Sequence, residues 1–158
     1  MFLTVHATAG VIVGQQTGNV WLAFLAGIIS HIILDIIPHG DQDLVESSEK
    51  FKPEEIKKLR RIALLDILIM MALLSAIYLS GVITINQTWP VLLAAFGAIL
   101  PDFLSGIYAL TNWRWLRWQF QFQYRLHFLL GGFTINLKKG FVVQTIFLAM
   151  LLAVIFIL

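Results

Sequence analysis

The sequence predicts an all-α, polytopic membrane protein with about five hydrophobic segments, and three observations support this fold class. Hydrophobic residues make up 59% of the 158 residues and charged residues only 13%, with a mean hydropathy of +0.85. Apolar runs of near-membrane length recur along the chain. Most of the charged residues are clustered in two loops instead of covering a surface. By length, we expect a single membrane domain, residues 1–158.

The first two hydrophobic segments cover residues 2–14 and 19–38. The first contains His6, and in and just after it glycines recur at a spacing of four, which lets membrane helices approach closely: Gly10, Gly14 and Gly18. Its thirteen residues extend only about 20 Å as a helix, so it either continues toward Asn19 or re-enters the membrane. No Lys or Arg precedes its apolar part, so we expect no cleaved signal peptide.

Three further hydrophobic segments follow, at residues 62–80, 91–110 and 141–158. The third segment is preceded by a helix start with Pro53 at its first position and two acidic residues in its first turn. The fourth carries a stripe of small and polar residues that we expect to pack against other helices: Ala94, Ala98, Asp102, Ser105 and Ala109. The last segment contains no ionisable side chain.

Residues 111–139 form an interfacial segment in which aromatic residues are mixed with arginines. Strict alternation over residues 118–124 favours a strand, because side chains of a strand repeat every two residues. One helical face is an equally good fit, since four side chains repeat at helical spacing: Trp113, Leu116, Phe120 and Tyr124. Either structure predicts a belt of amphipathic side chains at the membrane surface.

The basic residues predict the orientation in the membrane. They lie in a soluble loop at about residues 39–61 and in the interfacial segment, so both regions should be cytoplasmic. The carboxyl terminus then lies outside, and the protein is expected in the cytoplasmic (inner) membrane. We attribute the pI near 9.1 to this charge asymmetry and expect no nucleic-acid binding.

The second segment ends in a group of residues that can bind metal or protons. His31 and Asp35 are four residues apart, so on a helix they lie on one face, about 40° apart in projection. Pro38 tends to end the helix, which puts His39 and Asp41 in the following turn, where they can also be simply solvated.

The predicted topology brings further ionisable residues to the same cytoplasmic layer: His6, Asp66, Asp102 and His127. A buried carboxylate in a membrane helix costs roughly 2.5 to 3.5 kcal/mol, so something should offset these charges. Because the chain has no cysteine, any metal must be held by imidazole and carboxylate, which suits Zn, Mn, Fe or Mg.

Each residue also has a purely structural interpretation. His31 and Asp35 can form a hydrogen-bonded pair in the core, and His6 can be an isolated histidine near the terminus. Asp102 follows a proline and can cap the backbone groups freed by a helix bend. Asp66 can reach toward Arg61 and the interface.

The sequence also resembles a known family. The opening HATAG, the segment SHIILDIIPHGD and the later ILPD with a downstream histidine are similar to membrane-bound metal-dependent hydrolases of the YdjM type. The His-x-x-x-Asp pair is similar to ligand pairs in zinc-dependent phospholipase C and its nuclease relatives. The resemblance implies a metal site, zinc first and manganese as an alternative, at four residues: His6, His31, Asp35 and Asp102. It implies that His39 and Asp41 lie at the rim.

The first functional hypothesis is therefore a membrane-embedded, zinc-type hydrolase at the cytoplasmic leaflet that cleaves a phosphoester or ester of a lipid. Asp41, or failing it His39, is the expected general base. Basic residues of the interfacial segment are expected to hold an anionic headgroup: Arg114, Arg117, Arg125 and His127.

Two other functions remain open at this stage. One is a non-catalytic membrane assembly or partner-binding protein, with a structural metal or none. The other is a proton- or ion-coupled transporter, since intramembrane Asp and His also form ion relays. The Gly and Ala faces of the helices also allow a homo-oligomer.

Overall fold

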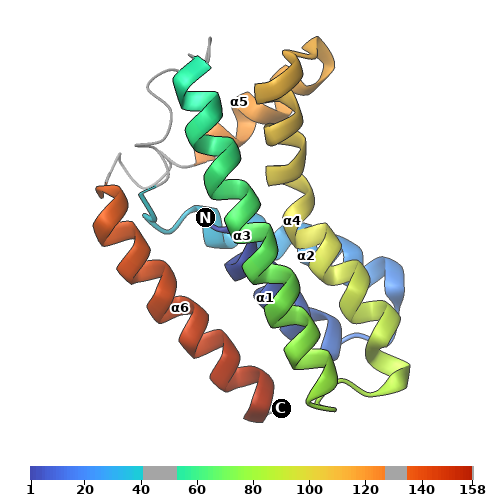
Figure 1. The fold of residues 1–158 in the computed structure, drawn as a ribbon. Coiled ribbons are helices and arrows are strands. Elements are labelled where there is room, and N and C mark those ends of the chain that lie inside the picture. The colour runs from blue at the N-terminus through green and yellow to red at the C-terminus, as the bar shows by residue number, and fades with distance from the viewer. Residues whose placement is uncertain (41–52, 127–134, 158) are drawn as a thin grey trace.

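The computed structural model describes residues 1–40, 53–126 and 135–157, and these ranges contain helices and no strand. The predicted all-α class is confirmed for this part of the chain (Figure 1). The elements are α1 Leu3–Gln15, α2 Val20–Asp35, α3 Pro53–Leu79, η2 Ile85–Gln87, α4 Thr88–Thr111, η3 Arg114–Leu116, α5 Arg117–Leu126 and α6 Leu137–Ile157.

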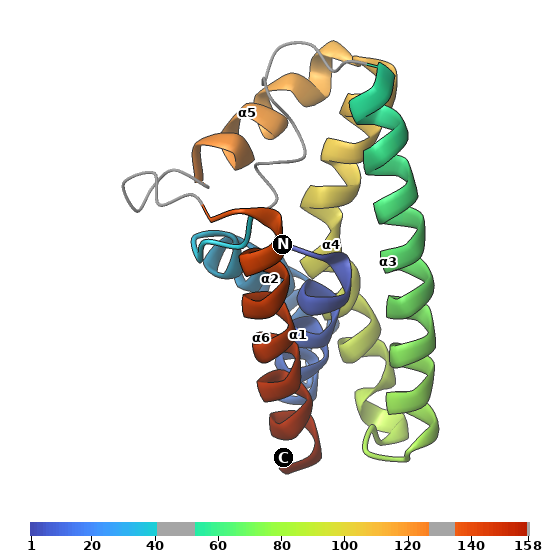
Figure 2. The ribbon, with the colours of Figure 1, turned by 60° about the vertical axis from the view of Figure 1, so that its left-hand side comes forward.

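Three helical stretches are long and apolar enough to cross a membrane: Pro53–Leu79, Ile85–Thr111 and Leu137–Ile157. The helices α1 and α2 have 13 and 16 residues, so a count of five spans is not confirmed. Figure 2 shows α1 and α2 covering only part of the length of α3. The segment at residues 19–38 is shorter as a helix than expected because α2 ends at Asp35, before Pro38.

Close backbone contacts between small residues hold α1, α2 and α4 together. A Cβ atom at Gly27 would lie 2.2 Å from the Ala94 carbonyl oxygen, and one at Gly97 would lie 2.3 Å from the Phe24 carbonyl oxygen. A Cβ at Gly10 would lie 2.6 Å from the Ala95 Cα. The expected small-residue packing is thus confirmed, and these glycine faces are used within the chain.

Not every predicted small residue takes part in this packing. A Cβ atom at Gly14 would lie 2.4 Å from the Val91 Cα, but one at Gly18 would have nothing within 4 Å. Gly18 follows the end of α1, so it lies beyond the helix contact that its spacing suggested. On α4, the buried members of the stripe are Ala94, Ala98 and Ala109.

The amino terminus of α1 is capped by side chains from two other helices. Asp66 of α3 accepts hydrogen bonds from the backbone N–H groups of Leu3 at 2.6 Å and Thr4 at 3.3 Å. Gln144 of α6 accepts one from the Phe2 N–H at 2.6 Å. Asp66 is buried in this contact, so the expectation that it reaches toward Arg61 is wrong; the unpaired amides of a helix start bind its carboxylate instead.

Residues 117–126 form a helix, α5, which decides between the strand and the helix expected there. Its buried residues are Gln119, Gln123 and Leu126, and not the predicted aromatic face. The side chains of Trp115 and Trp118 are 79% and 70% exposed. The glutamines face α4, where Gln119 bonds to Ser105 and to the Pro101 carbonyl, whereas Phe120 packs on Tyr108 and Trp118 points outward.

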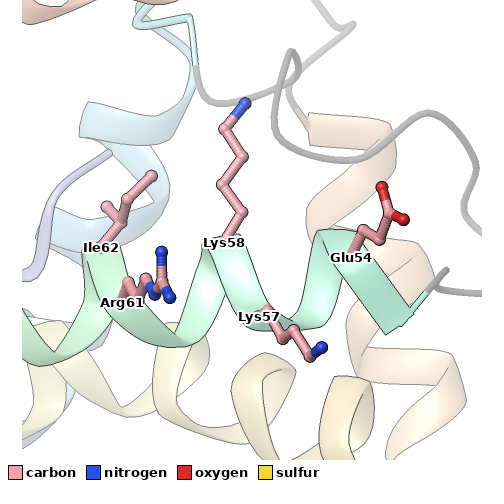
Figure 3. A pocket seen from close by; sticks show the side chains of 5 residues that line it. All are labelled: Glu54, Lys57, Lys58, Arg61 and Ile62. Carbon is pink, nitrogen blue, oxygen red and sulfur yellow. The ribbon is translucent and has the colours of Figure 1, made fainter.

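The first turns of α3 are exposed and charged. Figure 3 shows Lys57, Lys58 and Arg61 projecting from these turns, together with Glu54 and Ile62. Residues 53–61 thus continue the membrane-length helix, and the rest of the predicted soluble loop, residues 41–52, lies outside the described residues.

Candidate metal centre

His31 and Asp35 lie side by side in the last turns of α2, as their spacing predicts. The side chains are 0% and 1% exposed, and His31 Nε2 lies 3.0 Å from Asp35 Oδ2. Asp35 Oδ1 lies 3.1 Å from both His6 Nε2 and the Met1 nitrogen. A buried carboxylate thus joins two imidazoles from different helices.

The backbone of α4 fixes the orientation of the His31 ring. Its Nδ1 lies 2.8 Å from the carbonyl oxygen of Ala98. A carbonyl only accepts hydrogen bonds, so Nδ1 must carry the proton and donate it. In the neutral ring, Nε2 then holds a lone pair that faces the cluster, which is the arrangement usual for a metal-binding histidine.

His6 enters the same space from α1. Its ring stacks on that of His31 with 4.1 Å between the centroids, and it is fully buried. The His6 Nδ1 atom has no hydrogen-bond partner among the described residues. The fixed position of α1 against α4 therefore brings an imidazole to the pair from a distant part of the sequence.

Asp102 completes the cluster from α4. Its Oδ2 lies 3.7 Å from His6 Nε2, and its Oδ1 lies 3.9 Å from His31 Nε2. Its side chain is 25% exposed, whereas those of the other members are buried. Ligand atoms of His6, His31 and Asp102 all lie within 4.8 Å of one another, so this group could hold a metal ion. The four predicted metal residues are thus brought together, and we call them the His–Asp cluster.

The donor set fits a divalent cation. Asp35 Oδ2 accepts no hydrogen bond within the described residues, although His31 Nε2 is only 3.0 Å away. If His31 is neutral, two lone-pair atoms face each other at this distance, and a cation between them would turn repulsion into attraction. Imidazole nitrogen and carboxylate oxygen are common zinc ligands, and the same set also suits manganese or iron.

His39 is fully buried, which differs from the rim or solvated-turn position expected for it. Its Nδ1 lies 2.6 Å from the Ile37 carbonyl oxygen, and its Nε2 lies 3.9 Å from Asp35 Oδ1. The reason is that α6 packs directly over this turn. Gln144 donates to the His39 carbonyl at 2.9 Å, and a Cβ at Gly140 would lie 2.0 Å from the same oxygen.

Sequence reasoning missed Gln123, which contacts the cluster from α5. Its Nε2 lies 2.8 Å from His31 Nε2 and 3.2 Å from Asp102 Oδ1. Gln119 donates to Gln123 Oε1 at 2.8 Å, and Ser105 also donates to that oxygen. The available signal was the run of alternate glutamines, Gln119, Gln121 and Gln123, of which the first and last lie on one helical face.

The remaining predicted site residues are not in the cluster as described. Asp41 and His127 lie outside the described residues. The expected headgroup residues Arg114, Arg117 and Arg125 are all exposed on η3 and α5. They belong to the surface around α5 and not to the buried cluster.

Comparison with protein families, curated proteins and solved structures finds no match to this chain.

Proposed function

We propose that this protein is a membrane-embedded, metal-dependent hydrolase that cleaves an ester or phosphoester of a lipid. The observation that carries the proposal is the convergence of His6, His31 and Asp102 on one point, with Asp35 in contact with both histidines. The resemblance to the hydrolases of the YdjM type supports the same reading. Zinc is the proposed metal because the ligands are imidazole and carboxylate without thiolate.

The residues of the cluster have different tasks in this proposal. His31 is oriented by the Ala98 carbonyl and presents Nε2 to the metal. Asp35 positions His6 through Oδ1, and its Oδ2, which accepts no hydrogen bond within the described residues, would be left to bind the metal. Asp102 is the member that reaches an open cavity, so the substrate approaches from its side. His6, His31, Asp35 and Asp102 would hold the cation, which would supply Lewis acidity for the hydrolysis of an ester.

Proton transfer is assigned to the turn after α2. Asp41 remains the proposed general base, with His39 as the alternative. Support for His39 comes from its Nε2, which lies 3.9 Å from Asp35 Oδ1, while its Nδ1 is committed to the Ile37 carbonyl. Gln123 is proposed to position His31 and Asp102, because both N–H groups of its amide are used on these two side chains.

The proposal includes the membrane orientation that the basic residues predict. Three helical stretches could cross a membrane, and the exposed basic residues of α3 and α5 then lie at the cytoplasmic surface. The carboxyl terminus lies outside. Arg114, Arg117 and Arg125 are proposed to attract anionic headgroups from the cytoplasmic leaflet.

Metal content tests the proposal directly. Detergent-purified wild-type protein should contain close to one zinc or manganese per chain, and His31→Ala and Asp35→Ala should each lose it. Thr8→Ala is the control, because Thr8 is also fully buried on α1 but bonds only to the Thr4 carbonyl as described. Absence of metal from the wild type after growth with added zinc would contradict the proposal.

A structural metal site is the second candidate, and Gln123 is the observation that favours it. The amide contacts both His31 and Asp102, so both of its N–H donors are used within the cluster and neither is left for a substrate. Hydrolysis of a panel of lipid phosphates and lipid esters at pH 6 to 8 separates the two. Metal-loaded protein without turnover on that panel supports the structural site.

A further inference from the structure

An apolar cavity of about 550 Å³ lies between α3, α4, α5 and the first residues of the chain. Its volume is within the range of about 300–1,000 Å³ that is usual for ligand pockets. We call it the α3–α4 cleft. Asp102 is the member of the His–Asp cluster that lines it.

The walls of the cleft are almost entirely hydrocarbon. Ile56, Leu59 and Ile67 line it from α3, and Ile107 lines it from α4. Small residues on both helices leave the space open, among them Ala63 and Gly106. An apolar cavity of this kind binds an apolar group, because water inside it would lack hydrogen-bond partners.

The mouth of the cleft lies on helices that could cross a membrane. Leu64 of α3 and Phe103 and Leu110 of α4 all line it, and they are 55%, 55% and 62% exposed. Large exposed apolar side chains on both sides of an opening are unfavourable in water and favourable in lipid. The opening therefore faces the hydrocarbon of the bilayer, from which a lipid chain can enter sideways.

The inner end of the cleft is polar and joins the His–Asp cluster. Asp66, Asp102 and Gln123 line this end, and Asp102 is the partly exposed member of the cluster. A ligand that fills the cleft thus has its apolar part along the walls and its polar part at Asp102.

Charge near the cleft selects the kind of lipid. Arg60 lines the cleft, and Lys57, Lys58 and Arg61 project from the same turns of α3 (Figure 3). All four side chains belong to exposed residues. Clustered basic residues next to a membrane helix attract anionic headgroups, worth about 1 kcal/mol for each residue near the surface.

From these observations, we infer that the α3–α4 cleft binds the hydrocarbon chain of an anionic membrane lipid, whose anionic headgroup lies at Arg60. The inference deepens the proposed function by naming the place where its lipid substrate binds and the charge of that lipid, and the reaction at the metal rests on that proposal. Binding of the hydrocarbon chain itself does not require the metal. The inference about the cleft and the proposed hydrolase function can therefore fail separately.

Gly106 offers a way to fill the cleft without disturbing the helix packing. A Cβ at Gly106 would meet nothing within 4 Å, and the residue lies inside α4, where leucine is a better helix former than glycine. Gly106→Leu should therefore fold and occupy the space of the chain. Leu92→Phe is the matched control, because Leu92 is exposed on the same helix and does not line the cleft.

The probe is phosphatidylglycerol with a photoreactive diazirine in one acyl chain, presented in mixed vesicles with phosphatidylcholine. After illumination, mass spectrometry should map the label to cleft residues of α3 and α4 in wild-type and Leu92→Phe protein. Gly106→Leu should lower this labelling about tenfold, the effect of forcing a chain into filled space. Arg60→Gln should lower labelling by the phosphatidylglycerol probe more than by its phosphatidylcholine counterpart.

Labelling confined to the outer faces of the helices, or equal labelling of the cleft in Gly106→Leu, would overturn the inference. Two measurements separate the inference about the cleft from the proposed function: labelling of the cleft after metal removal, and turnover of lipid by the metal-loaded protein. Cleft labelling without turnover of any lipid supports the cleft and contradicts the hydrolase. Turnover of lipid without cleft labelling supports the hydrolase and contradicts the cleft.

Discussion

The amide nitrogen of Gln123 lies 2.8 Å from Nε2 of His31. His31 Nδ1 is bonded to a backbone carbonyl, so Nε2 is the atom that a metal would bind. The same amide nitrogen lies 3.2 Å from Asp102 Oδ1. The α5 helix is thereby connected to two members of the His–Asp cluster through one side chain.

Replacing Gln123 with glutamate should strengthen metal binding. Gln123→Glu puts a carboxylate of nearly the same shape next to His31 and Asp102, where it adds an anionic oxygen ligand. We expect the dissociation constant for Zn²⁺ to fall about tenfold, which corresponds to about 1.4 kcal/mol of binding free energy. Competition with a chelating dye measures this constant. Gln121→Glu, on the same helix but outside this hydrogen-bond network, should leave the constant unchanged. Equal or weaker binding by Gln123→Glu would show that the side chain does not reach the metal.

Metal binding should stabilise the fold, and Asp102 should be needed for it. A ligand that binds only the folded state adds about 2.7 kcal/mol at a concentration of 100 times its dissociation constant. Adding Zn²⁺ should therefore raise the thermal unfolding midpoint of metal-depleted wild type in detergent. Asp102→Asn keeps the shape but weakens the ligand, so its midpoint should rise much less. Identical shifts in both proteins would mean that zinc binds elsewhere.

Asp66 should contribute to stability as a cap of α1 and not as a metal ligand. Its carboxylate accepts hydrogen bonds from the N–H groups of Leu3 and Thr4 and from the Thr4 hydroxyl. Asp66→Ala leaves buried donors unpaired and should cost about 1–3 kcal/mol. The metal content per folded chain should stay at the wild-type level. Glu54→Ala, in the exposed first turn of the same helix, is the control for loss of a carboxylate.

The contact between α2 and α4 should not tolerate a methyl group. A Cβ at Gly27 would lie 2.2 Å from the Ala94 carbonyl oxygen, and backbone on both sides leaves no flexible group to move. Gly27→Ala should therefore destabilise the protein by about 1–3 kcal/mol despite the better helix propensity of alanine. Because this contact positions His31 against Ala98, the zinc affinity should also fall.

Gly18→Ala is the matched control for this substitution. Nothing lies within 4 Å of a Cβ at Gly18, so its thermal midpoint and zinc affinity should match those of the wild type. A Gly27→Ala protein as stable as this control would show that the two helices are free to separate slightly.

Local patterns were sufficient for the features that depend on one helix. Composition predicted an all-α membrane protein because a chain with 59% hydrophobic residues cannot cover itself with polar surface. A spacing of four predicted the contact between His31 and Asp35, since the period of a helix alone brings such residues to one face. The glycine spacing predicted close packing at Gly10 and Gly14 for the same reason.

Local patterns did not decide the structure where two different periodicities fit the same residues. Residues 118–124 fit a strand and a helix equally well, and only contacts with α4 selected the helix and its buried glutamines. Apolar content likewise did not distinguish a full span from the short helices α1 and α2. Asp41 and His127 lie outside the described residues, and their roles stay predictions.

The sequence by itself therefore determined the class of protein and the His31–Asp35 pair. The tertiary structure decided which other side chains reach that pair: His6 by the packing of α1 on α4, and Gln123 by the docking of α5. It also assigned Asp66 to the start of α1 and buried His39 beneath α6. The physical reason is that helical periodicity fixes angles within a helix, whereas contacts between helices depend on how small residues let their backbones approach.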